Sequence, residues 1–388
     1  MSIIKLKNMS DLLDLGKLSF YWRMTSRPNT PENPVPDFVD FSFSFLEEYQ
    51  LLIQTRNSQT WQYLETIYKE NYNVGYLQDG HALAENYGGD FIKFINYAIE
   101  KFNPNIKRVS EIGAGGCYIL KQLKKQGYSV AAIDPSPIAH KAGLEFGIDV
   151  IPDFYPSDRE MTKSDMMIHY DVLEHVPDPA AFLRNHKKDL TSNGLILFAV
   201  PDCTPYIEKG DISMILHEHL NYYNSVSLEN VVRAAGFEPL EIRKADYGGV
   251  LYCVAKVDAL NTWTPRKGND DFTTFVNNSN RLVQKVNAFV AEGTSNGNTL
   301  GCYIPLRVTP YLSIAKITGG IRFFDDNPGL YQQYFDGFNT PVENFSDLVK
   351  KPVSHILIMS FAFGDKIKQK ILEQSSGASM KIMSLKDL

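Results

Sequence analysis

The stretch SEIGAGGCY, residues 110–118, decides which fold the sequence predicts. Its first half ends an apolar run typical of a buried strand, and its last residue opens a helical pattern. Glycines at such a turn let the backbone approach a ligand closely, and the start of the next helix offers unpaired N–H groups to a carboxylate or phosphate. The stretch therefore predicts a ligand-binding βα turn. The alternative is a tight turn that binds nothing.

Strands and helices alternate around this turn. Apolar runs at RVSEIG, SVAAID, IDVIP, DMMIHYDV and GLILFAV predict five strands, and helical patterns predict helices over 118–126, 138–146 and 180–190. An amphipathic helix is expected before them over 84–102. After them, LENVVRAAGFEPLEI predicts a helix that stops at Gly236 and then a strand, and LYCVAKV predicts another strand. Such alternation predicts a parallel sheet covered by helices on both faces.

The two ends of the chain differ from this central part. The N-terminal region combines a Pro- and Asn-rich loop at 27–38 with the strand-like alternation FSFSF. Beyond residue 258 the expected elements are a long helix at 270–292, strands at 321–324 and 355–359, and a helix at 365–373. We expect an α/β protein with a small N-terminal domain, a central domain and a smaller C-terminal α/β domain, at 1–75, 76–258 and 259–388.

Composition argues against several classes of partner. The chain has 388 residues and a formal net charge of −6, so we expect no nucleic acid and no membrane as partner. Its four cysteines are far apart, which argues against a disulfide framework and a cysteine-rich zinc site. No signal-peptide core and no run of about 18 apolar residues occurs. We expect a soluble, cytoplasmic protein that acts on a small molecule, and the sequence leaves its oligomeric state open.

Two cofactors are compatible with the glycine turn. A dinucleotide-binding GxGxxG motif would put Tyr118 in the place of the third glycine, and tyrosine is too large for the close packing needed there. An acidic residue followed by GxGxG matches Glu111, Gly113 and Gly115, with Cys117 at the last glycine position. This motif resembles that of the class I methyltransferases, which use S-adenosylmethionine (SAM). The resemblance implies their Rossmann-like sheet.

Other residues extend this cofactor site. Asp134 closes the second strand, where a carboxylate accepts the ribose hydroxyls of either cofactor. The pair Asp153 and Phe154 follows the third strand and offers a carboxylate and a ring to adenine, with a plain surface loop as the alternative. The phrase DVLEHVPDP, residues 171–179, is similar to the segment after strand four in many class I methyltransferases. The predicted cofactor-binding residues are Glu111, Gly113, Gly115, Asp134, Pro135, Asp153, Phe154 and Asp171.

The sequence after residue 215 resembles one particular group of class I methyltransferases. The segment LHEHLNYYNSVSLENVVRAAGFEPLEI resembles the Tyr-His-Glu-His segment of the sugar C-methyltransferases, which act on nucleotide-linked 4-keto deoxysugars. YGGVLY resembles their Gly-Gly-Ser-Leu-Arg turn, and GNTLGCY, RFFDDNP and SHILIMSFAFGDKI follow the order of their C-terminal domain. Segments before residue 78 resemble their N-terminal domain, so the resemblance covers nearly the whole chain.

Departures from that family concern the acceptor and a metal. Its N-terminal domain carries a four-cysteine zinc site, whereas this chain has no cysteine before Cys117, so we expect a zinc-free domain. Leu216 replaces a tyrosine, Val250 a serine and Tyr252 an arginine. These positions leave three readings open. They are C-methylation of a 4-keto deoxysugar, N- or O-methylation of another metabolite or sugar, and a non-catalytic SAM-binding homologue.

The stretch LHEHLNYY, residues 216–223, holds the candidate base. Two histidines at i and i+2 without an HExxH motif fall short of a zinc site, so no metal is expected. Methylation of carbon requires removal of a proton beside a ketone, and a histidine suits this near neutral pH. The resemblance implies His219 as base, Glu218 and Tyr222 as supporting groups, and His175 nearby. Its implied substrate contacts are Tyr76, His217 and Asn298. The alternative is that both HEH histidines are satisfied polar residues of a lid.

Overall fold

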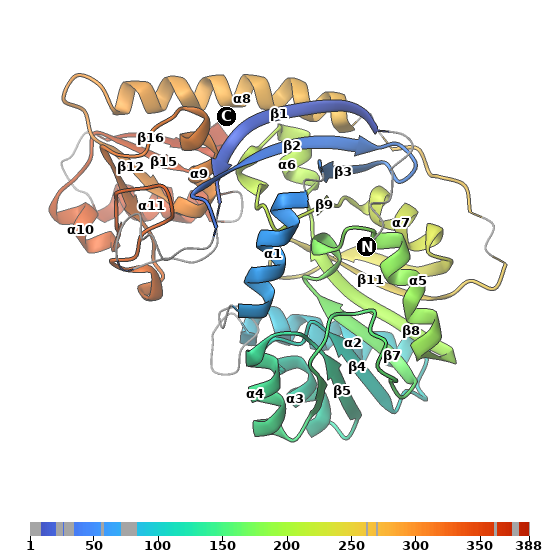
Figure 1. Ribbon diagram of the computed structural model, residues 1–388. Helices are drawn as coiled ribbons and strands as arrows, with labels where there is room; N and C mark the ends of the chain where they lie inside the picture. Colours follow the sequence, from blue (N-terminus) through green and yellow to red (C-terminus); the bar gives the residue numbers. More distant parts are fainter. Residues whose placement is uncertain are drawn as a thin grey trace. The chain divides into compact units, whose positions relative to one another are not determined.

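The computed structural model describes most of the chain (Figure 1). The described residues are 9–20, 26, 35–55, 58–70, 84–260, 263–268, 271–360, 363–374 and 380–387. They fall into two compact units. Unit 1 comprises Met1–Ser10, Phe45–Thr204 and Glu218–Asn269, and unit 2 comprises Asp11–Ser44, Pro205–His217 and Asp270–Leu388. These units alternate along the chain, which differs from the three consecutive domains expected from the sequence. That three-part division stays a prediction.

Unit 1 contains a seven-stranded sheet in the order β10-β11-β8-β7-β4-β5-β6. The five strands from β6 to β8 run parallel, whereas β11 and β10 are antiparallel additions at one edge. The bounds are β4 (Arg108–Ile112), β5 (Ser129–Ile133), β6 (Asp149–Ile151), β7 (Ser164–Tyr170), β8 (Leu190–Pro201), β10 (Phe237–Lys244) and β11 (Val250–Val257). The expected Rossmann-like parallel sheet is therefore confirmed. Since β4 lies between β5 and β7, the chain order reverses there, and this is where open α/β sheets bind ligands.

Apart from α1, which was not expected from the sequence, the helices of unit 1 follow the predicted pattern. They are α1 (Ser58–Glu70), α2 (Gly89–Phe102), α3 (Tyr118–Lys125), α4 (Pro137–Phe146), α5 (Pro179–Asp189) and α7 (Ser225–Ala234). The helix expected over 84–102 begins with a π-helical turn (Ala84–Gly88) before α2. The helix expected over 180–190 ends one residue early, because Leu190 already belongs to β8. Unit 1 also holds a small antiparallel pair, β3 (Leu51–Gln54) with β9 (Asn221–Tyr222).

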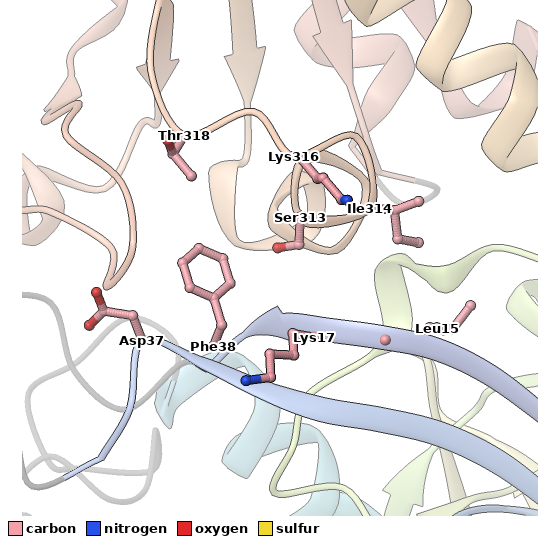
Figure 2. Close-up of a pocket in the computed structure, with 9 residues that line it drawn as sticks. Leu15, Lys17, Asp37, Phe38, Ser313, Ile314, Lys316 and Thr318 are labelled. Atoms are coloured by element: carbon pink, nitrogen blue, oxygen red, sulfur yellow. The ribbon is translucent and has the colours of Figure 1, made fainter.

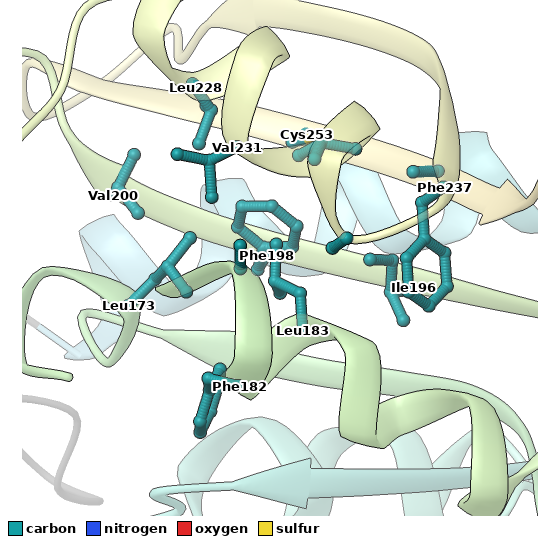
Figure 3. Packing of buried hydrophobic residues seen from close by; sticks show 14 of the residues in the cluster. Leu173, Phe182, Leu183, Ile196, Phe198, Val200, Leu228, Val231, Phe237 and Cys253 are labelled. Atoms are coloured by element: carbon teal, nitrogen blue, oxygen red, sulfur yellow. The ribbon is translucent and has the colours of Figure 1, made fainter. Parts of the chain in front are cut away.

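Apolar side chains cover both faces of this sheet. On one face, Phe182 and Leu183 of α5 and Val231 of α7 pack with Phe198 of β8 in a buried cluster (Figure 3). On the other face, Phe91 of α2 belongs to a second buried cluster with strand residues. Burial on both sides explains why these strands read as continuous apolar runs rather than as alternating ones.

Unit 2 contains a five-stranded, all-parallel sheet in the order β14-β13-β12-β15-β16. The bounds are β12 (Leu300–Tyr303), β13 (Ile321–Phe324), β14 (Val342–Glu343), β15 (His355–Ile358) and β16 (Lys381–Ser384). The accompanying helices are α6 (Thr204–Lys209), α8 (Asp271–Gly293), α9 (Pro305–Ile314), α10 (Phe345–Lys350) and α11 (Gly364–Gln374). Two long N-terminal strands, β1 (Met9–Ser19) and β2 (Phe38–Leu46), are neighbours, and FSFSF lies in β2 as expected. In the described part of the chain, no helix combines the length and apolarity that a membrane crossing needs.

Two histidines are buried in the core of unit 1. His169 of β7 has neither ring nitrogen hydrogen-bonded among the described residues, and its ring stacks on Phe198 at 4.6 Å between centroids. The His186 ring of α5 lies 5.7 Å from it, and its Nδ1 donates to the Phe182 carbonyl at 3.1 Å. Burial lowers the pKa of both side chains, that of His186 to about 4. Both imidazoles are therefore neutral inside the folded protein at pH 7.

Replacing His169 by phenylalanine should stabilise the protein at pH 7, by roughly 1–3 kcal/mol, because it removes a buried polar ring without partners. The wild-type protein should lose stability as the pH falls from about 6.5 toward 4, because the unfolded histidines take up protons before the folded ones do. The variant should lose less over the same range. Urea unfolding at several pH values measures both effects.

The matched control is His140→Phe, because His140 is exposed on α4. It should leave the urea midpoint and its acid dependence unchanged. A His169→Phe protein with the wild-type acid dependence would show that this buried imidazole does not control acid stability.

Candidate active site

The glycine turn after β4 has the backbone conformation that its sequence predicts. Gly113 has φ of +71°, Gly115 has φ of +47°, and α3 begins at Tyr118. A Cβ added to Gly113 would lie 2.6 Å from Cγ2 of Val172, too close for an ordinary contact. The turn therefore needs glycine both for its left-handed backbone and for space. It brings backbone close to the start of a helix, as a bound anion or nucleotide requires.

Asp134 joins this turn to the end of β5. Its carboxylate accepts hydrogen bonds from the N–H of Gly115 at 2.8 Å and from that of Ser136 at 2.7 Å. Pro135, another predicted cofactor contact, is the residue between Asp134 and Ser136. Glu111 is buried, and its Oε2 has no hydrogen-bond partner among the described residues. Burial, and then the charge of Asp134, raise the pKa of Glu111 well above its ordinary value. Two carboxyl groups thus flank the turn where the sequence predicts a cofactor.

The residues predicted to contact adenine, Asp153 and Phe154, lie in a loop whose own groups hydrogen-bond the Asp153 carboxylate. Asp153 accepts the backbone N–H of Phe154 at 2.8 Å and the hydroxyl of Ser157 at 2.6 Å. The Ser157 hydrogen bond is the main cause that lowers the pKa of Asp153. The Phe154 ring is 37% exposed and offers an apolar face. Contact of this pair with adenine stays a prediction.

The turn after β7 is strained and acidic. Asp171 has φ of +52°, a left-handed value that non-glycine residues rarely adopt. Burial and then Glu218 raise the pKa of Asp171 to about 7. Glu174 is only 1% exposed, and neither of its carboxyl oxygens has a hydrogen-bond partner in the described structure. Its burial, and then the charge of Asp171, raise its pKa well above the usual range.

Hydrogen bonds tie this acidic turn to the segment after Glu218. The Leu220 N–H donates to the Glu174 carbonyl at 2.7 Å, and Nδ1 of His175 donates to the Glu218 carbonyl at 2.8 Å. The side-chain amide of Asn221 donates to the carbonyls of Leu173, Glu174 and Val176 at 3.2, 3.4 and 2.8 Å, and the Tyr223 hydroxyl donates to Leu173. Two segments more than forty residues apart therefore form one rigid surface at the carboxyl end of β7.

This surface brings the predicted catalytic residues together. The rings of His175 and His219 are 5.0 Å apart between centroids, and that of Tyr222 lies 6.3 Å from His219. One potential ligand atom each from Glu174, His175 and His219 lies within 4.8 Å of the others. We call these three residues the EHH cluster. Both histidines are half-buried, and Tyr222 is buried in β9.

The three residues expected to contact the substrate, His217, Asn298 and Tyr76, do not lie together in one described site. His217 belongs to unit 2, where its Nε2 contacts the Val39 carbonyl at 3.1 Å and its ring lies 4.9 Å from Phe20. Burial lowers its pKa to about 4, so its surroundings match the alternative of a satisfied histidine. The Asn298 amide donates to the Glu292 carbonyl at 2.9 Å, as a loop-stabilising residue does. Tyr76 lies outside the described residues. All three substrate roles stay predictions.

Sequence reasoning missed Glu174 and Asn221. Glu174 stands beside His175 in DVLEHVPDP, and its position just past an apolar strand was the available signal. Asn221 had no such signal, because its role depends on carbonyls brought close only by the fold.

A separate pocket of about 740 Å³ lies within unit 2 (Figure 2). Figure 2 shows Phe38 of β2 and Ser313 of α9 on its walls, with Lys17 and Lys316 as cationic groups. The remaining lining residues are Leu15, Gly16, Asp37, Ile314 and Thr318. None of the predicted site residues lines it.

Comparison with known proteins agrees with the fold. Residues 83–242 match the family model of a methyltransferase domain. The ubiquinone biosynthesis O-methyltransferase of Pasteurella multocida is 32% identical over 110 residues, 24% of this chain and 46% of that protein. The Ralstonia nicotianae enzyme of the same name is 26% identical over 159 residues, 36% of this chain and 67% of that protein. The chain thus spans about half to two thirds of the length of these curated relatives.

Solved structures with similar arrangement include two methyltransferases. One is the Burkholderia thailandensis 1,6-didemethyltoxoflavin-N1-methyltransferase with bound S-adenosylhomocysteine, at 12% identity and a TM-score of 0.39, covering 60% of this chain and 99% of that one. The other, a SAM-dependent methyltransferase from Clostridium acetobutylicum, has 10% identity and a TM-score of 0.38 and covers 51% and 99%. Residues 83–242, which match the methyltransferase-domain model, include the strands β4 to β8 of the Rossmann-like parallel sheet.

Replacing Gly113 by alanine should weaken SAM binding at least about tenfold, because a left-handed alanine costs roughly 1–2 kcal/mol and its methyl group meets Val172. Calorimetric titration with SAM measures the change. Gly127→Ala is the matched control, because Gly127 also has positive φ (+97°) but faces open space. The control should bind SAM like the wild-type protein. Unchanged SAM affinity in Gly113→Ala would mean that this turn does not contact the cofactor.

Proposed function

Because residues 83–242 match the family model of a methyltransferase domain, we propose that the chain transfers the methyl group of SAM to a carbon of a nucleotide-linked 4-keto deoxysugar. The observation that carries the reaction type is the EHH cluster, which sets His219 beside His175 and Glu174 at the carboxyl end of β7. The choice of acceptor rests on the sequence resemblance to the sugar C-methyltransferases.

The proposed chemistry needs a base and a group that stabilises an oxyanion. His219 takes the proton from the carbon next to the ketone, and the electron pair moves to the ketone oxygen as an enolate. The enolate carbon then attacks the SAM methyl group, and S-adenosylhomocysteine leaves as a neutral thioether. The protein's task is to hold the carbon, the methyl carbon and sulfur in line.

The electrostatics of the cluster support this scheme. Ionised carboxylates around an enolate would oppose its formation. Burial, and then the charge of Asp171, raise the pKa of Glu174 well above its usual range, which favours the protonated form over the carboxylate. Glu218 lies close enough to raise the pKa of Asp171, and its carbonyl fixes the ring of His175. The Glu218 carbonyl thus orients His175, and the His175 ring packs beside His219, the proposed proton acceptor.

O-methylation is the second candidate, favoured by one specific observation. The curated relatives that match 24–37% of this chain are named O-methyltransferases. A hydroxyl acceptor would give its proton to the same His219, and no enolate would form. The two candidates therefore share the base and differ in the atom that becomes methylated.

The test is mass spectrometry of reactions containing SAM, the full chain and a panel of 4-keto nucleotide sugars and hydroxylated analogues. A product heavier by one methylene, formed from a keto sugar that also exchanges its α-proton for deuterium without SAM, is the expected result. His219→Ala should lower the methylation rate at least about a hundredfold while SAM affinity stays unchanged. His140→Ala, an exposed histidine on α4, is the matched control.

Each other outcome points elsewhere. Methylation without α-proton exchange would establish the O-methyl candidate and reject the carbon acceptor. A His219→Ala enzyme as active as the wild type would reject the base. Tight SAM binding without product from any acceptor would indicate a protein that only binds SAM.

A further inference from the structure

We infer that Glu174, His175 and His219 bind a divalent transition-metal ion. From the sequence alone no metal was expected, because the two histidines of HEH provide too few ligands. The fold supplies a different set. It adds a carboxylate and an imidazole from the turn after β7, and the three ligand atoms lie within 4.8 Å of one another. This inference goes beyond the proposed function and does not depend on the acceptor.

The distances suit an ion after a small rearrangement. Imidazole nitrogen and carboxylate oxygen bind zinc at about 2.0–2.2 Å, so ligand atoms on one ion are roughly 3–3.5 Å apart. Side-chain rotation that shortens the widest of these separations, at most 4.8 Å, by roughly 1–2 Å would bring the three atoms onto one ion. Two imidazoles and one carboxylate form the donor set of catalytic zinc and of non-haem iron(II), whereas magnesium and calcium prefer oxygen ligands alone.

The tautomer of His175 is already set for coordination. Its Nδ1 lies 2.8 Å from the Glu218 carbonyl, which only accepts hydrogen bonds, so Nδ1 carries the proton. The other nitrogen, Nε2, then holds a lone pair and lies 3.8 Å from Oε1 of Glu174. A backbone carbonyl that orients a metal-binding histidine in this way is a regular second-shell feature of metal sites.

Glu174 supplies the independent observation that a ligand belongs here. Its side chain is 1% exposed, yet neither carboxyl oxygen has a hydrogen-bond partner among the described residues. A buried carboxyl group left without a partner is costly. A cation at this place would give Glu174 the partner that the described residues do not supply.

An ion at this place would change how the cluster acts. His219 cannot hold a metal and accept a proton through the same nitrogen. A bound ion would therefore occupy the nitrogen that the proposed proton transfer needs, and His219 would act as the base only in the metal-free protein.

The experiment uses the untagged full chain, stripped with a chelator and titrated with Co²⁺ and Zn²⁺. The wild-type protein should bind one equivalent by calorimetry, and Co²⁺ should give a visible d–d absorption band that saturates at that ratio. Glu174→Gln and His219→Ala should each weaken binding at least about tenfold. His140→Ala should bind like the wild type, and SAM titration checks that every variant keeps a folded methyltransferase domain.

The inference fails if the wild-type protein gives no saturable Co²⁺ band, which needs no variant to interpret. It also fails if Glu174→Gln and His219→Ala bind the ion with wild-type affinity. Methylation by an enzyme that gives no saturable Co²⁺ band would leave the proposed function standing and reject only the metal. One equivalent of bound metal without methyl transfer would do the reverse.

Discussion

The hydrogen bonds between residues 173–176 and 218–223 are the constraint on which the candidate site depends. The side-chain amide of Asn221 donates hydrogen bonds to three carbonyls of the turn after β7. The Glu174 carbonyl is one of them, and it also accepts a hydrogen bond from the Leu220 backbone N–H. Such hydrogen bonds satisfy backbone carbonyls of the turn, whose burial without a partner would cost free energy. The turn after β7 and residues 218–223 consequently stabilise each other. These hydrogen bonds also hold His175 and His219 in place.

The site brings buried carboxyl groups close to one another, which is unfavourable for the stability of the fold. Glu111 beside Asp134 and Glu174 beside Asp171 are both pairs in which burial and a neighbouring carboxylate raise a pKa. A protein keeps such groups where a ligand compensates them. The first pair lies at the glycine turn after β4, and the second lies at the EHH cluster after β7; β4 and β7 are adjacent in the sheet. In the proposed function, cofactor and acceptor would bind at these neighbouring strand ends.

The sequence predicted what depends on local pattern. Apolar runs and glycine punctuation located the strands of unit 1 and the turn at Gly113, because burial on both faces and positive φ constrain the residues at those positions directly. It could not predict where His217 lies, since its hydrogen-bond partner, Val39, is 178 residues away. The i, i+2 spacing suggested one face for both HEH histidines, yet the boundary between units falls between His217 and Glu218. Glu174 was missed for a related reason, because a lack of partners appears only in three dimensions.

The contacts of Asp134 bear on how the turn accepts SAM. Both of its oxygens already accept a backbone N–H, from Gly115 and Ser136. A carboxylate has about four acceptor positions, so two remain for ribose hydroxyls without breaking either bond. The same carboxylate can therefore shape the turn and bind the sugar. Glu111 differs from Asp134, because its Oε2 lacks a hydrogen-bond partner among the described residues and burial raises its pKa well above the usual value.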